Sequence, residues 1–334
     1  MTQRDAALAA WLEGVAPKYG INPQDIAPAS ADASFRRYFR VQGVGQSFIV
    51  MDAPPEHENN EAFVRVDALM AEAGLNVPKI LEQDLERGFL LLTDLGTQTY
   101  LSVLNEENAA RLFDQATTAL VKWQAASRPG VLPEYDRAVL LREIELFPEW
   151  YVQRHCGIQW DEKRRKWWSM TVEAILKNNL AEEKVFVHRD FMPRNLMVSD
   201  PMPGVLDFQD ALYGPVSYDI ASLMRDAFIS WNESFVLDIS IRYWEKARKA
   251  GVPVPRDFGA FYRDIEYMGL QRHLKVLGIF ARIRYRDGKP KYLEDAPRFL
   301  AYVRQTAGRY IELSPLKHLI DELSGVQEKA GYTF

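Results

Sequence analysis

The chain has 334 residues, of which 47% are apolar and 26% charged, so it is long enough for two compact domains with a sizeable core. Its formal net charge of −5 excludes a general nucleic-acid-binding protein, because such proteins present a basic surface. The sequence has no apolar run of 18 residues, no secretory signal and only one cysteine, Cys156, so we expect a cytoplasmic protein without disulfides.

The first 95 residues predict a small β-sheet crossed by one helix. Short aromatic and β-branched runs are separated by turn residues, which is typical of antiparallel hairpins. Apolar residues near the N-terminus recur at helical spacing. The expected elements are a helix at 5–18, strands at 35–42 and 47–52, a helix at 60–73, and strands at 79–83 and 88–93.

After Gly96 the pattern becomes mostly helical and contains one β-rich island. The expected helices are 99–126, 138–155, 161–180, 217–229, 233–250, 258–285 and 296–324, and the expected island strands are 185–187, 196–198 and 204–206. A sheet-rich small lobe before a helical large lobe with such an island is the layout of protein-kinase-like folds. We therefore predict an α+β, bilobal fold, with an N-lobe at 1–95 and a C-lobe at 96–334.

The β island carries the strongest chemical signal. Residues 188–195 (HRDFMPRN) fit the pattern H-x-D-x-x-x-x-N, and Asp207 follows an apolar strand 12 residues beyond Asn195. Phosphoryl transfer needs one carboxylate to accept the proton of the attacking hydroxyl. It also needs a carboxamide and a second carboxylate to hold Mg²⁺ against the phosphates. These residue types at this spacing indicate a kinase that uses ATP and Mg²⁺.

The set of motifs resembles the aminoglycoside phosphotransferase and choline kinase-like branch of the protein-kinase superfamily, because residues 214–221 (GPVSYDIA) also fit its G-x-x-x-x-D-(I/L)-A pattern. The resemblance implies ATP and Mg²⁺ as cofactors. It also implies a role for each motif residue: Asp190 as catalytic base, His188 as a brace of the loop, Asn195 and Asp207 as metal ligands, and Asp219 as a cap on the loop backbone. Asp210 is either a second group near the metal or a surface acid.

The small lobe departs from this pattern, because no lysine occurs between Lys18 and Lys79. Kinase-like folds place a phosphate-binding lysine on the third strand, here near Met51 or Asp52. We expect an arginine to replace it, since guanidinium groups grip phosphate bidentately. The candidates that share one strand face with Tyr38 are Arg36 and Arg40. A solvated basic face is the alternative.

The remaining nucleotide contacts rest on the resemblance. The hairpin loop over the phosphates has serines in place of glycines, and their hydroxyls either bind phosphate or only stabilise the turn. Leu90 to Leu92 would line the adenine cleft, with backbone groups of Thr93 to Leu95 bonding the base. The expected nucleotide-binding residues are thus Ser30, Ser34, Arg36, Leu92, Thr93 and Leu95.

Seven sequence stretches, spread over nearly the whole chain, resemble a narrower group within this family. They are FRRYFRV, IVMDAPPE, FLLLTDLG, LFPEWY, HRDFMPRNLMV, VLDFQDALYGPVSYD and QRHLKVLGIFARI. They are similar to the cell-wall-recycling anomeric sugar kinases, which phosphorylate N-acetylmuramic acid and N-acetylglucosamine at the C1 hydroxyl. This likeness implies ATP plus an amino sugar giving the α-1-phosphate and ADP. We expect a monomer whose partner is the small sugar, with no nucleic acid or membrane partner.

The helix near 262–286 supplies weaker support for the acceptor. It carries Arg272, Lys275, Arg282 and Arg286 on one face. A basic helix face beside the acceptor suits the lactyl carboxylate of N-acetylmuramic acid. We expect Arg272, Lys275 and Asp210 to contact substrate, and for the two cations partly exposed charges are the alternative. Aromatic residues at 147–168 either form a sugar-stacking platform or belong to the core.

Two other functions stay open. One is a kinase of the same fold for an aminoglycoside, choline or homoserine, and the other is a non-catalytic nucleotide-binding protein, suggested by the missing lysine.

Overall fold

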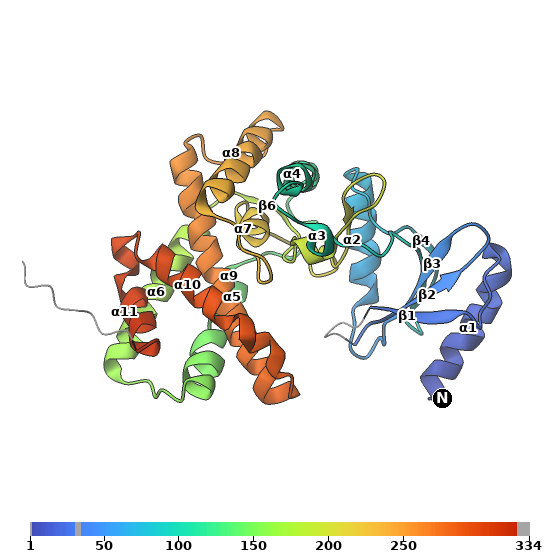
Figure 1. Ribbon diagram of the computed structural model, residues 1–334, viewed down its shortest axis with the longest axis horizontal. Coiled ribbons are helices and arrows are strands. Elements are labelled where there is room, and N and C mark those ends of the chain that lie inside the picture. Colours follow the sequence, from blue (N-terminus) through green and yellow to red (C-terminus); the bar gives the residue numbers. More distant parts are fainter. Residues whose placement is uncertain (1, 31–34, 326–334) are drawn as a thin grey trace, which may run out of the picture. The chain divides into compact units, whose positions relative to one another are not determined.

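The computed structural model describes residues 2–30 and 35–325 (Figure 1). The chain forms two compact units: Met1–Trp123 with Arg194–Ala211, and Gln124–Pro193 with Leu212–Phe334. This division does not follow the expected lobe boundary after residue 95, which stays a prediction. No helix within the described ranges combines the length and the hydropathy of a membrane span.

The first unit contains a five-stranded antiparallel sheet in the order β1-β2-β3-β5-β4. Its strands are β1 (Ile26–Ser30), β2 (Arg37–Gln42), β3 (Ser47–Asp52), β4 (Ile80–Asp84) and β5 (Phe89–Thr93). The four strands expected from the sequence are confirmed within two residues. Strand β1 was not expected from the sequence, because its segment, IAPAS, lacks alternating β-branched residues and contains a proline.

Helix α1 (Gln3–Tyr19) covers one face of this sheet (Figure 1). Its Leu8, Trp11 and Leu12 form a core with side chains from alternate strand positions. The strand residues of this core are Val41, Phe48, Val50, Phe89 and Leu91. Because successive side chains of a strand point to opposite faces, Ile49, Met51, Leu90 and Leu92 lie on the other face.

Helix α2 (Asn60–Glu72) and the hairpin of β7 (Leu196–Met197) and β8 (Gly204–Val205) complete the part of the first unit that carries the site. The Val205 N–H donates to the Asn76 carbonyl at 2.7 Å, and the Phe63 ring of α2 lies 5.0 Å from Phe208. The helix expected at 99–126 is two helices, α3 (Tyr100–Val103) and α4 (Ala109–Ala125). The break occurs where Asn108 bonds the Val103 carbonyl with its side chain.

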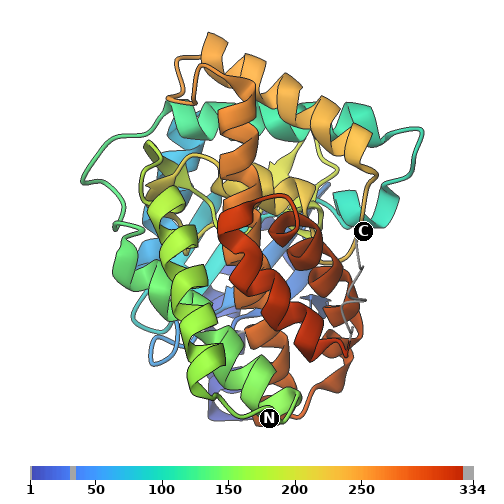
Figure 2. The same ribbon diagram turned by 90° about the vertical axis from the view of Figure 1, so that its left-hand side faces the viewer.

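The second unit is helical around the two-stranded sheet of β6 (Lys184–Val187) and β9 (Leu212–Pro215). Figure 2 shows the long helix α9 (Phe258–Asp287) running through this unit beside other helices. They include α5 (Arg137–Ile144), the π-helix η1 (Phe147–His155), α6 (Glu162–Asn179), α7 (Tyr218–Met224), α8 (Glu233–Lys249) and α10 (Ala296–Ala307), while α11 (Ser314–Leu323) packs against α6 and α10. The short 3-10 helices are η2 (Pro193–Asn195), η3 (Pro290–Asp295) and η4 (Ile311–Leu313).

Two expected helices are interrupted in this unit. The segment 138–155 changes from α5 to a π-helix near Pro148, whose ring cannot donate a backbone hydrogen bond. The π-helix packs against α9 where a Cβ at Gly278 would lie only 2.4 Å from the Leu146 backbone, so only glycine fits. The segment 296–324 breaks after Ala307 into α10, η4 and α11.

Candidate active site

The loop that follows β6 is held by a carboxylate on α7. The Asp219 carboxylate accepts the His188 N–H at 2.7 Å and the Arg189 N–H at 3.0 Å. This is the capping contact predicted from the sequence. Burial raises the pKa of Asp219 to about 7, and the two backbone hydrogen bonds oppose that rise.

His188 and Arg189 shape the same loop from within. His188 is buried, and its Nδ1 accepts the Asp190 N–H at 3.3 Å, a geometry that fits the expected bracing role. Arg189 has a positive φ of 78°, a strained value for a residue with a side chain. The loop thereby presents Asp190, which is half-buried, one residue after the strained position.

A buried network under the loop was not foreseen from the sequence. Arg189 donates to the Glu143 carboxylate of α5 at 2.5 Å, Tyr135 donates its hydroxyl to the same carboxylate, and the Lys275 ammonium lies 3.6 Å from it. Burial would raise the pKa of Glu143, but the charges of Lys275 and Arg189 outweigh it and hold that pKa below its ordinary value. Glu143 therefore stays charged and anchors the loop.

The two expected metal ligands lie in the first unit and touch each other. Asn195 ends η2, and its Nδ2 donates to Asp207 Oδ2 at 3.1 Å, while Gln209 donates to Asp207 Oδ1 at 2.9 Å. The Leu206 N–H donates to the Asn195 carbonyl at 3.0 Å. This contact uses the amide nitrogen of Asn195 and not its oxygen, which is the atom that would coordinate a magnesium ion.

Asp207 adopts a positive φ of 64°. Within residues 2–30 and 35–325, Asp207 and Arg189 are the two non-glycine residues with a positive φ. Such strain costs of the order of 1–3 kcal/mol per residue and is typical of functional sites.

One amide and one carboxylate also fit magnesium better than zinc. No group of three or more histidine, cysteine or acidic side chains suited to a metal occurs in the described ranges.

A methionine and an aspartate occupy the two positions of β3 where a phosphate-binding lysine was expected. Met51 is fully buried and lies on the face of the sheet opposite α1. Asp52 is fully buried on the α1 side, where it accepts the Nε–H groups of Arg4 at 2.7 Å and Arg37 at 2.8 Å. Neither position supplies a cation, and Arg37 is engaged on the α1 face.

The two arginines of the other face have different partners. Arg40 donates to both oxygens of Asp94, at 2.5 and 3.0 Å, and to the Gly96 carbonyl. Arg36 pairs with Glu58 at 2.8 Å just before α2, and both side chains are about nine-tenths buried. Arg36 lies next to residues 31–34, the loop expected to cover the phosphates.

The other expected nucleotide-binding residues are only partly described. Ser30 ends β1, and Ser34 lies outside the described residues. Leu92 is buried on the face opposite α1, whereas Leu91, also expected in the cleft, belongs to the α1 core. The Thr93 N–H already donates to the Lys79 carbonyl at 3.0 Å, so it is not open to adenine.

Leu95 packs against β8, since a Cβ at Gly204 would lie 2.9 Å from its side chain. The nucleotide roles of Ser30, Ser34, Leu92, Thr93 and Leu95 stay predictions.

The expected acceptor residues also differ in their surroundings. Asp210 is exposed. Lys275 is buried and donates to the Tyr218 hydroxyl at 2.9 Å, besides lying near Glu143. Arg272 is buried beside the Tyr218 ring, with 5.6 Å between the guanidinium carbon and the ring centre. Their substrate roles stay predictions.

Of the aromatic residues at 147–168, Phe147, Tyr151 and Trp168 are buried, and the Phe147 ring stacks on Tyr151 and lies tilted against Trp168, as core residues do.

Residues 25–252 match the phosphotransferase enzyme family. The chain is 55% identical over 298 residues to an N-acetylmuramate/N-acetylglucosamine kinase of Pseudomonas putida, covering 89% of this chain and 88% of the relative. It is 52% identical over 338 residues to a protein of the same name from Neisseria meningitidis serogroup B, covering 99% and 100%.

Among solved structures, the chain resembles a choline kinase of Streptococcus pneumoniae with a TM-score of 0.64, at 14% identity over 90% of this chain and 98% of that one. It also resembles an ADP-bound aminoglycoside phosphotransferase with a TM-score of 0.59, at 15% identity over 89% and 97%. These likenesses confirm the predicted protein-kinase-like fold. The chain belongs to the phosphotransferase enzyme family.

Proposed function

We propose that this kinase transfers the γ-phosphoryl group of ATP to the anomeric hydroxyl of N-acetylmuramic acid or N-acetylglucosamine, giving the α-1-phosphate and ADP in peptidoglycan recycling. The observation that supports this proposal most is the 52–55% identity, over most of both chains, to proteins named as kinases of these two sugars. The fixed loop backbone before Asp190 and the contact between Asn195 and Asp207 support it as well, because phosphoryl transfer needs a positioned base and metal ligands.

Asp190 is the base in this proposal. The loop that carries it is fixed by Asp219 from α7 and by Glu143 from α5, so its carboxylate is presented in a defined position. The anomeric hydroxyl is more acidic than an ordinary sugar hydroxyl, because the ring oxygen withdraws electron density. A carboxylate can therefore take its proton late, as the loose transition state forms.

Asn195 and Asp207 would hold Mg²⁺ through one amide oxygen and one carboxylate. A bound Mg²⁺ would neutralise charge that develops on the phosphate oxygens. Asp207 is oriented for this task by hydrogen bonds from Asn195 and Gln209. The nucleotide would further use Ser30, Ser34 and the segment from Leu92 to Leu95, except for the Thr93 N–H, which already donates to the Lys79 carbonyl.

Arg36 is our candidate for the cation that replaces the missing lysine. Strand alternation assigns Arg37 to the α1 face, where it pairs with buried Asp52. Arg40 donates its hydrogen bonds to Asp94 and Gly96, which follow the end of β5. In protein kinases a lysine–glutamate ion pair must be in place for catalysis, and the buried Arg36–Glu58 pair offers a comparable arrangement.

The test of the proposed function is a comparison of free sugars with their 1-O-methyl glycosides. The enzyme should phosphorylate N-acetylmuramic acid and N-acetylglucosamine but not the glycosides, which lack the anomeric hydroxyl. Phosphorylation of a methyl glycoside would contradict the anomeric assignment. Inert sugars together with turnover of choline or an aminoglycoside would favour the alternative kinase, which a shared fold at 14–15% identity supports.

A cytoplasmic location and a monomeric state stay predictions, and equilibrium sedimentation of the pure protein tests the second.

A further inference from the structure

The catalytic loop, the end of α7 and the middle of α9 carry four buried or half-buried cations of the second unit. They are Arg189, Arg225, Arg272 and Lys275. A buried charge is unfavourable unless a counter-charge or hydrogen bonds compensate it. The partners of each cation therefore indicate which of them is already satisfied within the protein.

Arg189 and Lys275 share one carboxylate. Glu143 lies 2.5 Å from the Arg189 guanidinium and 3.6 Å from the Lys275 ammonium, which also donates to the Tyr218 hydroxyl at 2.9 Å. Both cations thus belong to the network that anchors the loop. Lys275, although expected from the sequence to bind substrate, is compensated in this way.

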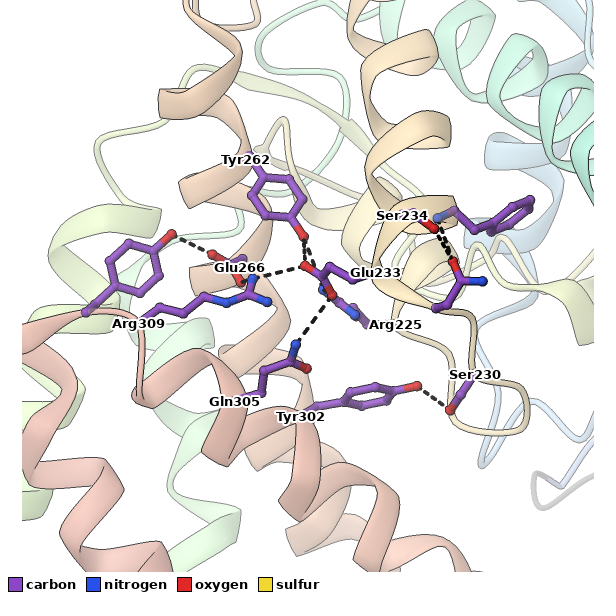
Figure 3. Close-up of polar contacts among 12 residues, drawn as sticks. Arg225, Ser230, Glu233, Ser234, Tyr262, Glu266, Tyr302, Gln305 and Arg309 are labelled. Carbon is purple, nitrogen blue, oxygen red and sulfur yellow. Dashed lines mark hydrogen bonds and ion pairs between the residues drawn. The ribbon is translucent and has the colours of Figure 1, made fainter.

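Arg225 belongs to a second network, shown in Figure 3. Its guanidinium donates to Glu233 at 2.9 Å and to the Tyr262 hydroxyl at 3.2 Å, and it lies over the Tyr302 ring. Arg309 adds a second cation to Glu233 at 3.0 Å. Arg225 therefore fastens the end of α7 to α8, α9 and α10, and its charge is compensated.

Arg272 is the exception. Its side chain on α9 is only 5% exposed, yet within residues 2–30 and 35–325 its guanidinium has no hydrogen bond and no ion pair, and its Nε is fully buried. Its contact is the face of Tyr218, which precedes the loop-capping Asp219. Its positive charge lowers the pKa values of Asp219 and Asp226, although burial raises both overall.

Neither carboxylate is a direct partner of Arg272. Both oxygens of Asp219 accept backbone N–H groups of the catalytic loop. Asp226 Oδ1 accepts the N–H groups of Phe228 and Ile229 at 2.7 and 3.1 Å. The Arg272 guanidinium therefore has donors that no described residue uses. It lies over Tyr218, the residue of α7 that precedes the loop-capping Asp219. Such a group suits a carboxylate that arrives with the substrate, because it can bind both oxygens.

We propose that Arg272 binds the lactyl carboxylate of N-acetylmuramic acid and thereby sets the preference between the two sugars, whereas Lys275 positions the catalytic loop and does not read the substrate. This inference rests on the proposed function. N-acetylglucosamine has no carboxylate, so it gains nothing from Arg272. The two sugars consequently form a matched pair of substrates that differ in the group Arg272 would bind.

The experiment measures kcat/KM for both sugars in the wild type, Arg272→Met and Arg272→Lys. Arg272→Met should lower kcat/KM for N-acetylmuramic acid by roughly 10- to 100-fold, the range for a charge-assisted hydrogen-bonded contact, and leave N-acetylglucosamine within about threefold. Arg272→Lys should recover part of the loss. Equal losses for both sugars in Arg272→Met would overturn the proposal.

Two controls separate binding from scaffolding. Arg286→Ala removes an exposed arginine of the same helix, paired with its neighbour Asp287, and should change neither sugar. Lys275→Met should lower kcat for both sugars by the same factor, since Lys275 acts through Glu143 and the loop. A selective loss for N-acetylmuramic acid in Lys275→Met, without one in Arg272→Met, would reverse the assignment and overturn the proposal.

A substrate-side measurement avoids the risk that Arg272 variants fail to fold. The methyl ester of the lactyl group keeps the shape of N-acetylmuramic acid but removes its charge. The wild type should use the ester roughly 10- to 100-fold less well than the acid, as a lost charge-assisted contact requires. Equal use of ester and acid would overturn the proposal, whereas an enzyme inert toward every one of these sugars would contradict the proposed function itself.

Discussion

Replacing Arg36 with alanine tests how the enzyme manages without the third-strand lysine. Its side chain and that of Glu58 are 8% and 11% exposed and lie 2.8 Å apart, and Glu58 also accepts the Phe35 N–H at 3.2 Å. If the guanidinium bonds a phosphate, its loss removes one charge-assisted contact of about 1.5–3 kcal/mol. At about 1.4 kcal/mol for each factor of ten, kcat/KM for ATP should fall by roughly 10- to 100-fold.

The same change affects stability, and the assay must separate the two effects. Removing Arg36 leaves Glu58 buried without its cation, which destabilises a protein by about 3–5 kcal/mol. The double variant Arg36→Ala with Glu58→Gln removes that orphaned charge. It should recover most of the free energy of unfolding in urea but none of the lost kcat/KM for ATP, measured as initial rates at saturating sugar.

Arg37→Ala is the matched control, because Arg37 is a neighbouring arginine that pairs with Asp52 on the α1 face. It should alter stability while leaving kcat/KM for ATP within about threefold, a difference well under the roughly tenfold minimum expected for a phosphate contact. The reasoning is refuted if Arg36→Ala folds and keeps near-normal ATP kinetics. It is equally refuted if Arg37→Ala shows the larger kinetic loss.

Three further changes test other parts of the site. Asp190→Asn should bind ATP nearly as well as the wild type and lower kcat by roughly 10²–10⁴-fold, the range for a positioned base, so near-normal turnover would remove Asp190 from that role. Asp207→Ala should abolish turnover and weaken ATP binding only when Mg²⁺ is present, which calorimetry with and without the metal checks; an unchanged metal dependence would contradict the ligand assignment. Asp67 is buried on α2, its Oδ1 has no hydrogen-bond partner among the described residues, and burial raises its pKa to about 7. Its folded-state pKa lies above the unfolded value, so the free energy of unfolding should fall as pH rises from 4 through 7, by up to about 1.4 kcal/mol per unit. Asp67→Asn should flatten this decline in urea titrations, and an unchanged slope would show that another group causes it.

The sequence predicted what local patterns control. The hairpin of β2 and β3 follows from alternating residues on either side of Gly43 and Gly45, and the structure confirms it. The contact between Asp219 and the catalytic loop was also anticipated, although the two lie about 30 residues apart, because a family pattern carries both. Strand β1 and the breaks within long helices were missed, because prolines and asparagines there act against the surrounding pattern.

Ion pairs between residues far apart in the chain could not be predicted from a single sequence. Glu143 looks like any polar residue of an amphipathic helix, and its place beneath Arg189 appears only when α5 packs near the loop. The arginines of β2 illustrate the same limit. Their alternation was readable, but the partners that distinguish Arg36 from Arg40 come from segments 22 and 54 residues away.

The helix α9 shows how burial changes an interpretation. The sequence predicts a basic helix face that binds substrate, and it predicts the same substrate contact for Arg272 and Lys275. In the structure both are buried, but Lys275 contacts a phenol hydroxyl and a carboxylate, whereas among the described residues the Arg272 guanidinium has no hydrogen bond or ion pair and lies over the face of Tyr218. Compensation of charge, which depends on neighbouring helices, separates two residues that helical periodicity cannot distinguish.

Phosphorus NMR of the product formed from ATP and N-acetylmuramic acid tests the central proposal most directly. A sugar phosphate attached at C1 should appear together with ADP, with its phosphorus coupled to the anomeric proton of the α-anomer. A phosphate on any other hydroxyl would contradict the anomeric assignment, and release of inorganic phosphate without a sugar ester would contradict the proposed acceptor.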